Sequence, residues 1–118
     1  MKYEAVEAVT HEEAEAIARA GEAYALSRIA VAIALADEDL VWSTTFLLAL
    51  TKSEHVNVRG NALLGFGHLA RRFRAIPNTR AVAAAITEGL ADADAFVRGQ
   101  ADAAADDVRQ FIGPIETP

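Results

Sequence analysis

Two short stretches of the sequence decide the fold: V-R-G-N-A at residues 58–62 and V-R-G-Q-A at residues 97–101. They repeat in register at an offset of 39 residues, and each follows an acidic turn, S-E-H at 53–55 and D-A-D at 92–94. A self-similar unit of about 40 residues is typical of α-helical repeats, in which each helix pair buries its apolar face by stacking on its neighbour. The repeat therefore predicts stacked helix pairs.

Helix signals extend this pattern along the chain. Apolar residues recur at three- and four-residue spacing and strand signals are nearly absent, so we expect an all-α fold. Thr10 with Glu13 predicts a capping box, Gly21 a left-handed helix end, and Asn78 a helix cap. The predicted helices follow in order: 11–20, 22–36, 40–51, 56–73, 79–90 and 95–112.

These helices predict about three pairs in a short HEAT-like or armadillo-like α-solenoid, forming a single domain over residues 1–118. The first pair is a degenerate repeat, as expected of a terminal cap. A chain of 118 residues, 53% of them hydrophobic, is large enough for one compact core and too small for a second domain.

Composition also narrows the classes of function. The chain has no cysteine, which excludes disulfides, thiolate metal ligands and a cysteine nucleophile. No apolar run reaches the roughly 18 residues of a membrane span and no signal peptide is indicated, so a cytoplasmic location is expected. A net charge of −6 disfavours nucleic acid and anionic membrane as partners and favours a basic protein.

The stretch G-F-G-H-L-A at 65–70 matches a phosphate-cradling fingerprint. That fingerprint requires a preceding strand and a helix that begins at the glycines, whereas the residues from Arg59 onward already have a helical pattern. We therefore interpret Gly65 and Gly67 as positions where a neighbouring helix approaches closely.

Three arginines follow within residues 71–74, at the end of the predicted helix, where cations are favoured by the helix dipole. A basic nucleic-acid groove is the alternative. Three carboxylates between residues 102 and 107 of the facing helix would neutralise it, and no aromatic residues interleave to stack bases. We expect no nucleic-acid binding.

The sequence gives little support for enzyme activity or metal binding. His11 and Glu15 stand one turn apart like the start of a helical zinc motif, but the second histidine is missing. Ser53 has His55 close in sequence, in a turn expected to be exposed. We expect no enzyme activity, no metal, no cofactor and no small-molecule substrate.

The stretch D-E-D-L-V-W is one candidate partner-binding site. Asp37, Glu38 and Asp39 precede Trp42 across a turn between helices. An aromatic residue flanked by carboxylates suits a cationic partner. The alternative is that the acids cap a helix and Trp42 lies in the core.

The stretch D-A-A-A-D-D is a second candidate, because Asp102, Asp106 and Asp107 lie close together on one helix. Like charges at this spacing need compensating cations, which a partner could supply. Internal arginines are the alternative source: Arg98, Arg59 and Arg72.

The concave surface of the solenoid is the third candidate. By helical spacing, the polar face of the fourth and sixth helices carries matching positions: Asn61, Gly65, His68 and Arg72, then Gln100, Ala104 and Asp107. Their mixed polar character suits a protein interface better than a small-molecule pocket.

About 75 residues of the chain resemble small bacterial HEAT-repeat proteins. They lie in the segments D-E-D-L-V-W, V-R-G-N-A-L-L-G-F-G-H-L-A-R-R-F-R and A-D-A-D-A-F-V-R-G-Q-A-D-A-A-A-D-D-V-R-Q-F. The resemblance is to immunity proteins of polymorphic and contact-dependent growth-inhibition toxins. It implies that the chain binds one cognate toxin domain and blocks its active site. The residues that carry it are Asp39, Trp42, Arg59, Gly60, His68, Arg71, Asp106 and Asp107.

An acidic, cysteine-free chain without catalytic groups fits an inhibitor of a basic nuclease toxin, since complementary charge speeds association. Two other classes remain open. A HEAT-repeat scaffold or adaptor would bind several proteins, and a HEAT-type nucleic-acid or base-repair enzyme would be retained on DNA at low salt.

Overall fold

The structure, a computed structural model, describes residues 9–115 and is all-α within that range. Its helices are α1 (His11–Ala20), α2 (Ala23–Ala36), α3 (Leu40–Leu50), α4 (Val56–Phe73), α5 (Thr79–Leu90) and α6 (Ala95–Phe111). Every boundary lies within one residue of its prediction. The all-α prediction is confirmed.

Local capping explains why these boundaries were readable. Thr10 and Glu13 form the predicted capping box, and Gly21 ends α1 in the left-handed region with φ 75°. Asp94 caps α6 by accepting the backbone N–H groups of Phe96 and Val97. Asn78 stands at the N-cap of α5 as predicted, but its backbone is left-handed with φ 56° and its side chain makes no capping hydrogen bond.

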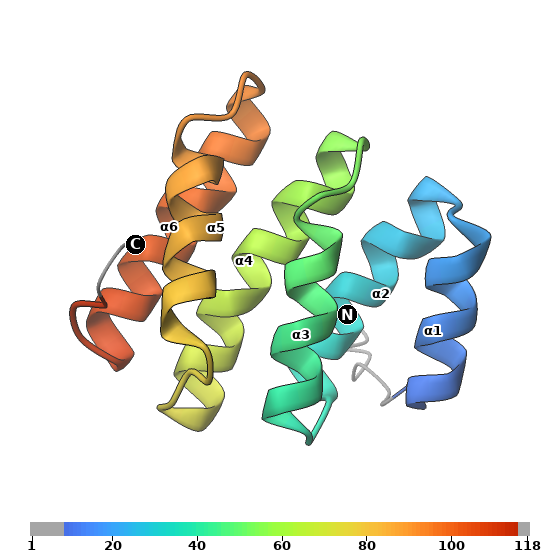
Figure 1. The fold of residues 1–118 in the computed structure, drawn as a ribbon, viewed down its shortest axis with the longest axis horizontal. Helices are drawn as coiled ribbons and strands as arrows, with labels where there is room; N and C mark the ends of the chain where they lie inside the picture. The colour runs from blue at the N-terminus through green and yellow to red at the C-terminus, as the bar shows by residue number, and fades with distance from the viewer. Residues whose placement is uncertain (1–8, 116–118) are drawn as a thin grey trace, which may run out of the picture.

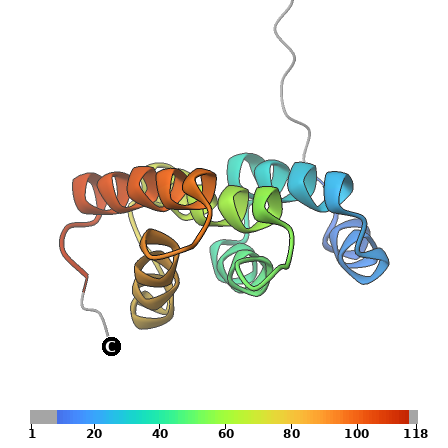
Figure 2. The ribbon, with the colours of Figure 1, turned by 90° about the horizontal axis from the view of Figure 1, so that it is seen from above.

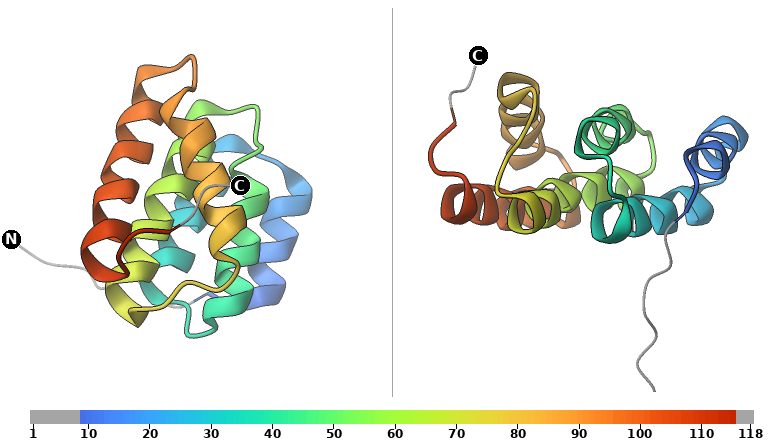
Figure 3. Two further views of the ribbon diagram at one scale, coloured as in Figure 1. Left: turned by 60° about the vertical axis from the view of Figure 1, so that its left-hand side comes forward. Right: turned by 90° about the horizontal axis from the view of Figure 1, so that it is seen from below.

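The helices form two layers (Figures 1 and 2). One layer contains α2, α4 and α6, and the other contains α1, α3 and α5. The view from below shows the same two layers (Figure 3). Within its layer α4 is central, with α2 on one side and α6 on the other, and these two pairs have the most extensive contacts of the fold. The surface of α4 therefore decides how the pairs fit together.

The core lies between the layers. The large side chains buried there come from five of the helices: Ile33, Leu47, Val58, Leu63, Phe66, Leu69, Val82 and Val97. The predicted close approaches on α4 are confirmed. A Cβ atom on Gly65 would lie 2.8 Å from Leu47 Cδ1 of α3, and one on Gly67 would lie 2.7 Å from Asp107 Oδ2 of α6. Glycine at these positions lets two neighbouring helices pack directly on the α4 backbone.

The V-R-G arginine joins consecutive repeats. Arg59 donates through Nη1 to the carbonyl oxygens of Ser53 and Glu54 in its own turn, at 3.1 and 3.2 Å. Its Nε and Nη2 donate to the two carboxylate oxygens of Asp92, each at 3.0 Å. Arg98 donates in the same way to two carbonyl oxygens of its own turn. In both repeats the motif arginine thus hydrogen-bonds to the turn before its own helix, and Arg59 also links the earlier repeat to the later one.

Candidate functional site

A row of polar side chains crosses the layer formed by α2, α4 and α6. Asn61 Nδ2 donates to Ser27 Oγ at 2.7 Å, and Gln100 Nε2 donates to Asn61 Oδ1 at 3.3 Å. All three side chains are half-buried. The three helices therefore share a row of hydrogen-bonded polar side chains, and Asn61 and Gln100, which were expected at matching positions of one surface, lie in contact there.

A second polar group lies further along the same face. Arg71 Nη2 lies 2.7 Å from His68 Nδ1, and Arg71 Nη1 lies 3.7 Å from Asp107 Oδ2. Burial and the neighbouring positive charge of Arg71 lower the pKa of His68, while Asp107 acts in the opposite direction. A neutral imidazole accepts the hydrogen bond from Arg71 through Nδ1. We call the surface made by Ser27, Asn61, His68, Arg71, Gln100 and Asp107 the ladder face.

Three predicted members of this face lie elsewhere. Gly65 and Ala104 are buried, because the helical faces that carry them pack against neighbouring helices. Arg72 is half-buried and donates to the carbonyl oxygens of Ala34 and Asp37, both at 2.8 Å. Its guanidinium also lies 4.6 Å from the centre of the Phe73 ring. Arg72 therefore joins the ends of α4 and α2, which corrects its assignment to a partner surface.

Asp37 and Trp42 also serve the fold. Asp37 is buried and accepts a hydrogen bond from Ser43 Oγ at 2.6 Å, while His11 Nε2 lies 2.9 Å from its other oxygen. The Trp42 ring stacks between His11, at 3.6 Å between ring centres, and Phe46, at 4.8 Å. These contacts join α1 to α3. Asp37 and Trp42 thus make contacts within the fold, and the acid that caps α3 is Asp39 rather than Asp37.

The remaining predicted acids are more accessible. Glu38 and Asp39 are exposed, and Asp39 accepts the backbone N–H of Trp42. Asp106 pairs with Arg109 on its own helix, and Asp102 is exposed without an ion pair to any described residue. Internal arginines do pair with two of the three aspartates, but they are Arg109 for Asp106 and Arg71 for Asp107 rather than the expected Arg98, Arg59 or Arg72.

Two exposed aromatic residues were missed by the sequence interpretation. Tyr24 is 67% exposed and Phe96 is 44% exposed. Each stands two residues after an acidic helix cap, Glu22 for α2 and Asp94 for α6. This repeated pattern of an acid followed by an aromatic residue was the available signal.

The described residues form two hollows. A cleft of about 140 Å³ between α3, α4 and α5 is lined by the ion pairs Arg59–Asp92 and Lys52–Glu88. The other, of about 400 Å³, is an open depression beside the α1–α2 and α3–α4 turns. Small-molecule sites are usually well-enclosed cavities of about 300–1,000 Å³, so the cleft is smaller and the depression more open than such a site. Within residues 9–115 no three His, Cys, Asp or Glu side chains gather to hold a metal ion. In the same range no helix has the length and apolar character needed to cross a membrane.

No protein-family model and no curated protein matches the sequence. Among solved structures, a chain from the crystal structure of a CDI (contact-dependent growth inhibition) complex from Cupriavidus taiwanensis superposes with a TM-score of 0.77. The two chains share a fold. The match covers 94% of this chain and 97% of that chain, at 23% sequence identity. Because nearly all of both chains align, the whole helical arrangement is common to them.

Proposed function

We propose that the chain is an immunity protein that binds a cognate toxin domain and blocks the active site of that toxin. The observation that carries this proposal is the fold shared, over nearly the full length, with a chain from a CDI complex. The V-R-G segments resemble the same class of protein. This resemblance rests on the amino-acid sequence rather than on the superposition of the two structures.

Electrostatics supports a basic toxin, such as a nuclease, as the partner. The chain carries a net charge of −6, and a nuclease active site must attract a polyanionic substrate with positive charge. An acidic protein competes for that same surface and associates quickly with it. Inhibition then requires only that the bound chain covers the substrate channel, so no catalytic group is needed.

The ladder face is the proposed contact surface for the toxin, with the exposed acids Glu38, Asp39, Asp102 and Asp106 around it. Its amides, imidazole and ion pair offer fixed donors and acceptors on packed helices. Such groups are oriented before binding, so little side-chain entropy is lost when a partner docks. A mixed polar surface of this type is normal for a complex whose components also exist separately.

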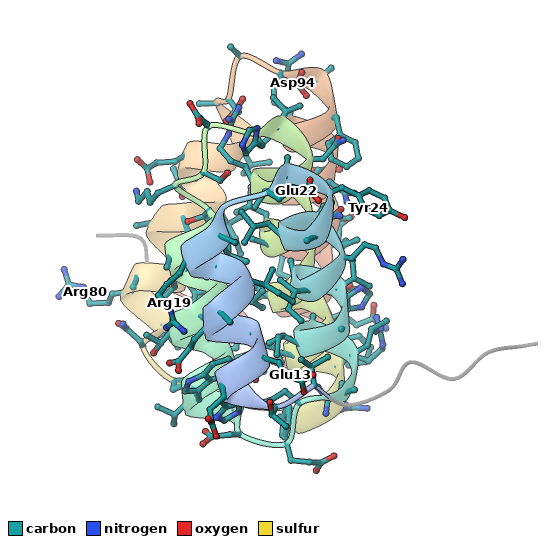
Figure 4. The ribbon with its side chains drawn as sticks, turned by 90° about the vertical axis from the view of Figure 1, so that its right-hand side faces the viewer. Glu13, Arg19, Glu22, Tyr24, Arg80 and Asp94 are labelled. Carbon is teal, nitrogen blue, oxygen red and sulfur yellow. The ribbon has the colours of Figure 1, made fainter. Side chains whose placement is uncertain are left out.

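The test is co-expression with the toxin domain that this proposal predicts to be encoded beside the chain's own gene. We expect the chain to restore growth and to form a one-to-one complex that abolishes nuclease activity in vitro. The double variant Asn61→Arg/Gln100→Glu should weaken that complex about tenfold or more, because it replaces aligned amides by charges. Arg80→Ala, on the opposite layer (Figure 4), is the matched control.

Two results would overturn the proposal. Unchanged toxicity together with capture of several unrelated proteins would indicate an adaptor. Retention on DNA at low salt in the absence of a protein partner would indicate nucleic-acid binding.

A further inference from the structure

Exposed apolar side chains gather at one edge of the molecule. Within residues 9–115 five large apolar side chains are exposed: Tyr24, Val41, Val56, Leu90 and Phe96. All except Val41 lie at the turns that join α1 to α2, α3 to α4 and α5 to α6. Figure 1 shows these turns together along the upper edge. We call residues 21–24, 51–56 and 90–96 the turn edge.

The turn edge is acidic as well as apolar. Its own residues include four carboxylates, from Glu22, Glu54, Asp92 and Asp94, and one ammonium group, from Lys52. The guanidinium groups of Arg59 and Arg98 also reach its backbone carbonyl oxygens. Arg59 pairs with Asp92, and Lys52 pairs with Glu88 of α5. No lysine or arginine of the described chain lies within ion-pair distance of the other three carboxylates. Glu54 lies 3.9 Å from His55 Nε2, and Glu22 and Asp94 accept backbone N–H groups as helix caps. These three carboxylates keep their negative charge beside the apolar side chains without a lysine or arginine partner.

The Phe96 ring packs against the fold, whereas Tyr24 is largely exposed. A Cβ atom on Gly60 would lie 2.5 Å from Phe96 Cε2, so the Phe96 ring packs directly against the α4 backbone. Tyr24 points outward from α2, with Glu22 and Asp94 at the same end of the molecule (Figure 4). The Arg28 guanidinium lies 5.7 Å from the centre of the Tyr24 ring, within cation–π range.

These features define one kind of occupant. Arginine and lysine side chains have apolar stems and charged heads, so their stems can pack on exposed rings while their heads reach carboxylates. An acidic partner would be repelled by the carboxylates of the edge, and a purely apolar one would leave them without counter-charges. Aromatic residues are also frequent anchors of protein interfaces.

We propose that the turn edge is the docking surface for a basic protein segment, whose arginine or lysine heads pair with Glu22, Glu54 and Asp94 while their stems pack on Tyr24 and Phe96. The inference rests on the proposed function for the identity of the partner, a basic toxin domain. It adds a second contact surface to the ladder face. The chemistry of the edge stands on the contacts and charges above.

A peptide titration tests the edge without the toxin. The isotope-labelled full chain is titrated with a short peptide of alternating arginine and leucine, and backbone amide shifts are followed by NMR. Shifts should be concentrated in residues 21–24, 51–56 and 90–96. The double variant Tyr24→Ser/Phe96→Ser should bind the peptide about tenfold more weakly. Val41→Ser, which changes the exposed apolar residue outside the turn edge, should bind it as the parent chain does.

The same variants are then compared for binding to the toxin domain. Loss of toxin binding in the double variant, with the Val41→Ser variant unaffected, supports both proposals. Peptide binding at the edge without any toxin binding keeps the edge and overturns the proposed function. Two results overturn the inference even if the toxin binds. One is amide shifts spread over other surfaces, and the other is equal peptide affinity of the double variant and the parent chain. Circular dichroism of each variant confirms that it is folded.

Discussion

Asp92 shows how one residue holds two repeats together. Its carboxylate accepts two N–H groups of Arg59, each at 3.0 Å, and the backbone N–H of Asp94 at 2.9 Å. The hydrogen bond from Arg59, followed by that from Asp94, lowers the pKa of Asp92. Because the folded pKa is depressed, this stabilisation is complete above the ordinary aspartate pKa of about 3.9 and is lost as the pH falls through the folded value.

Asp92→Asn should therefore lower the free energy of unfolding by about 1.5–3 kcal/mol near neutral pH, since it weakens charged hydrogen bonds in a half-buried site. The difference from the parent chain should shrink as the pH falls below about 3.9. Urea denaturation over a pH series measures both effects. Asp102→Asn, at an exposed aspartate without an ion pair, should change stability by less than about 0.5 kcal/mol. A loss that is independent of pH would contradict this account.

At the scale of elements, glycines determine how closely helices pack. Gly60 and Gly99 occupy the same position of the repeated motif, but their surroundings differ. Gly60 lies under the Phe96 ring, whereas a Cβ atom on Gly99 would have no neighbour within 4 Å. A Cβ atom on Gly89 of α5 would lie 2.6 Å from Leu63 Cδ1 and 2.9 Å from Ala101 Cβ. The same substitution should thus have opposite effects at Gly89 and Gly99.

Gly89→Ala should destabilise the protein by about 1–3 kcal/mol, because Ala101 Cβ is fixed to the α6 backbone and the helices must separate. Gly99→Ala should stabilise it by about 0.4–1 kcal/mol, through helix propensity and a less flexible unfolded chain. Thermal and urea denaturation of the two variants measure the difference. Equal shifts of the same sign would show that close packing at Gly89 does not decide the outcome.

At the scale of the whole molecule, the exposed face of α6 is polar where the matching face of α4 is apolar. Leu63 and Ala70 of α4 are buried at 2% and 0% exposure. The positions 39 residues later in α6 are Asp102 and Arg109, and both are exposed. Charged residues disfavour the apolar stacking of another helix on the face that carries them. α6 therefore buries one face and leaves the other, with Asp102 and Arg109, exposed.

Asp102→Leu/Arg109→Ala should increase self-association, because it restores on α6 the apolar surface that α4 uses for stacking. Sedimentation velocity over a range of protein concentrations measures the effect. Arg80→Leu, which adds an apolar residue at an exposed position of α5, is the control and should associate less. Association of the double variant no greater than that of the parent chain would contradict the expectation that these residues disfavour stacking.

Local signals determined the helices of this protein. Thr10, Gly21 and Asp94 act on backbone groups within four residues of themselves, so their effects are readable from the sequence alone. The repeat around Arg59 and Arg98 likewise predicted paired helices, because the offset between them is a property of the chain. Glycines at close approaches were predictable for the same reason, as a helix interior otherwise disfavours glycine.

Only the tertiary structure decided which polar residues are free to bind. Asp37 belongs to an acidic turn, yet it is buried. His11, 26 residues earlier in the chain, and Ser43 both contact its carboxylate. Asp107 has its ion pair with Arg71 of α4 rather than with a residue of its own helix. Helical spacing specifies the side of a helix on which a residue lies, but hydrogen bonds and ion pairs depend on what neighbouring helices place within about 3–4 Å of it.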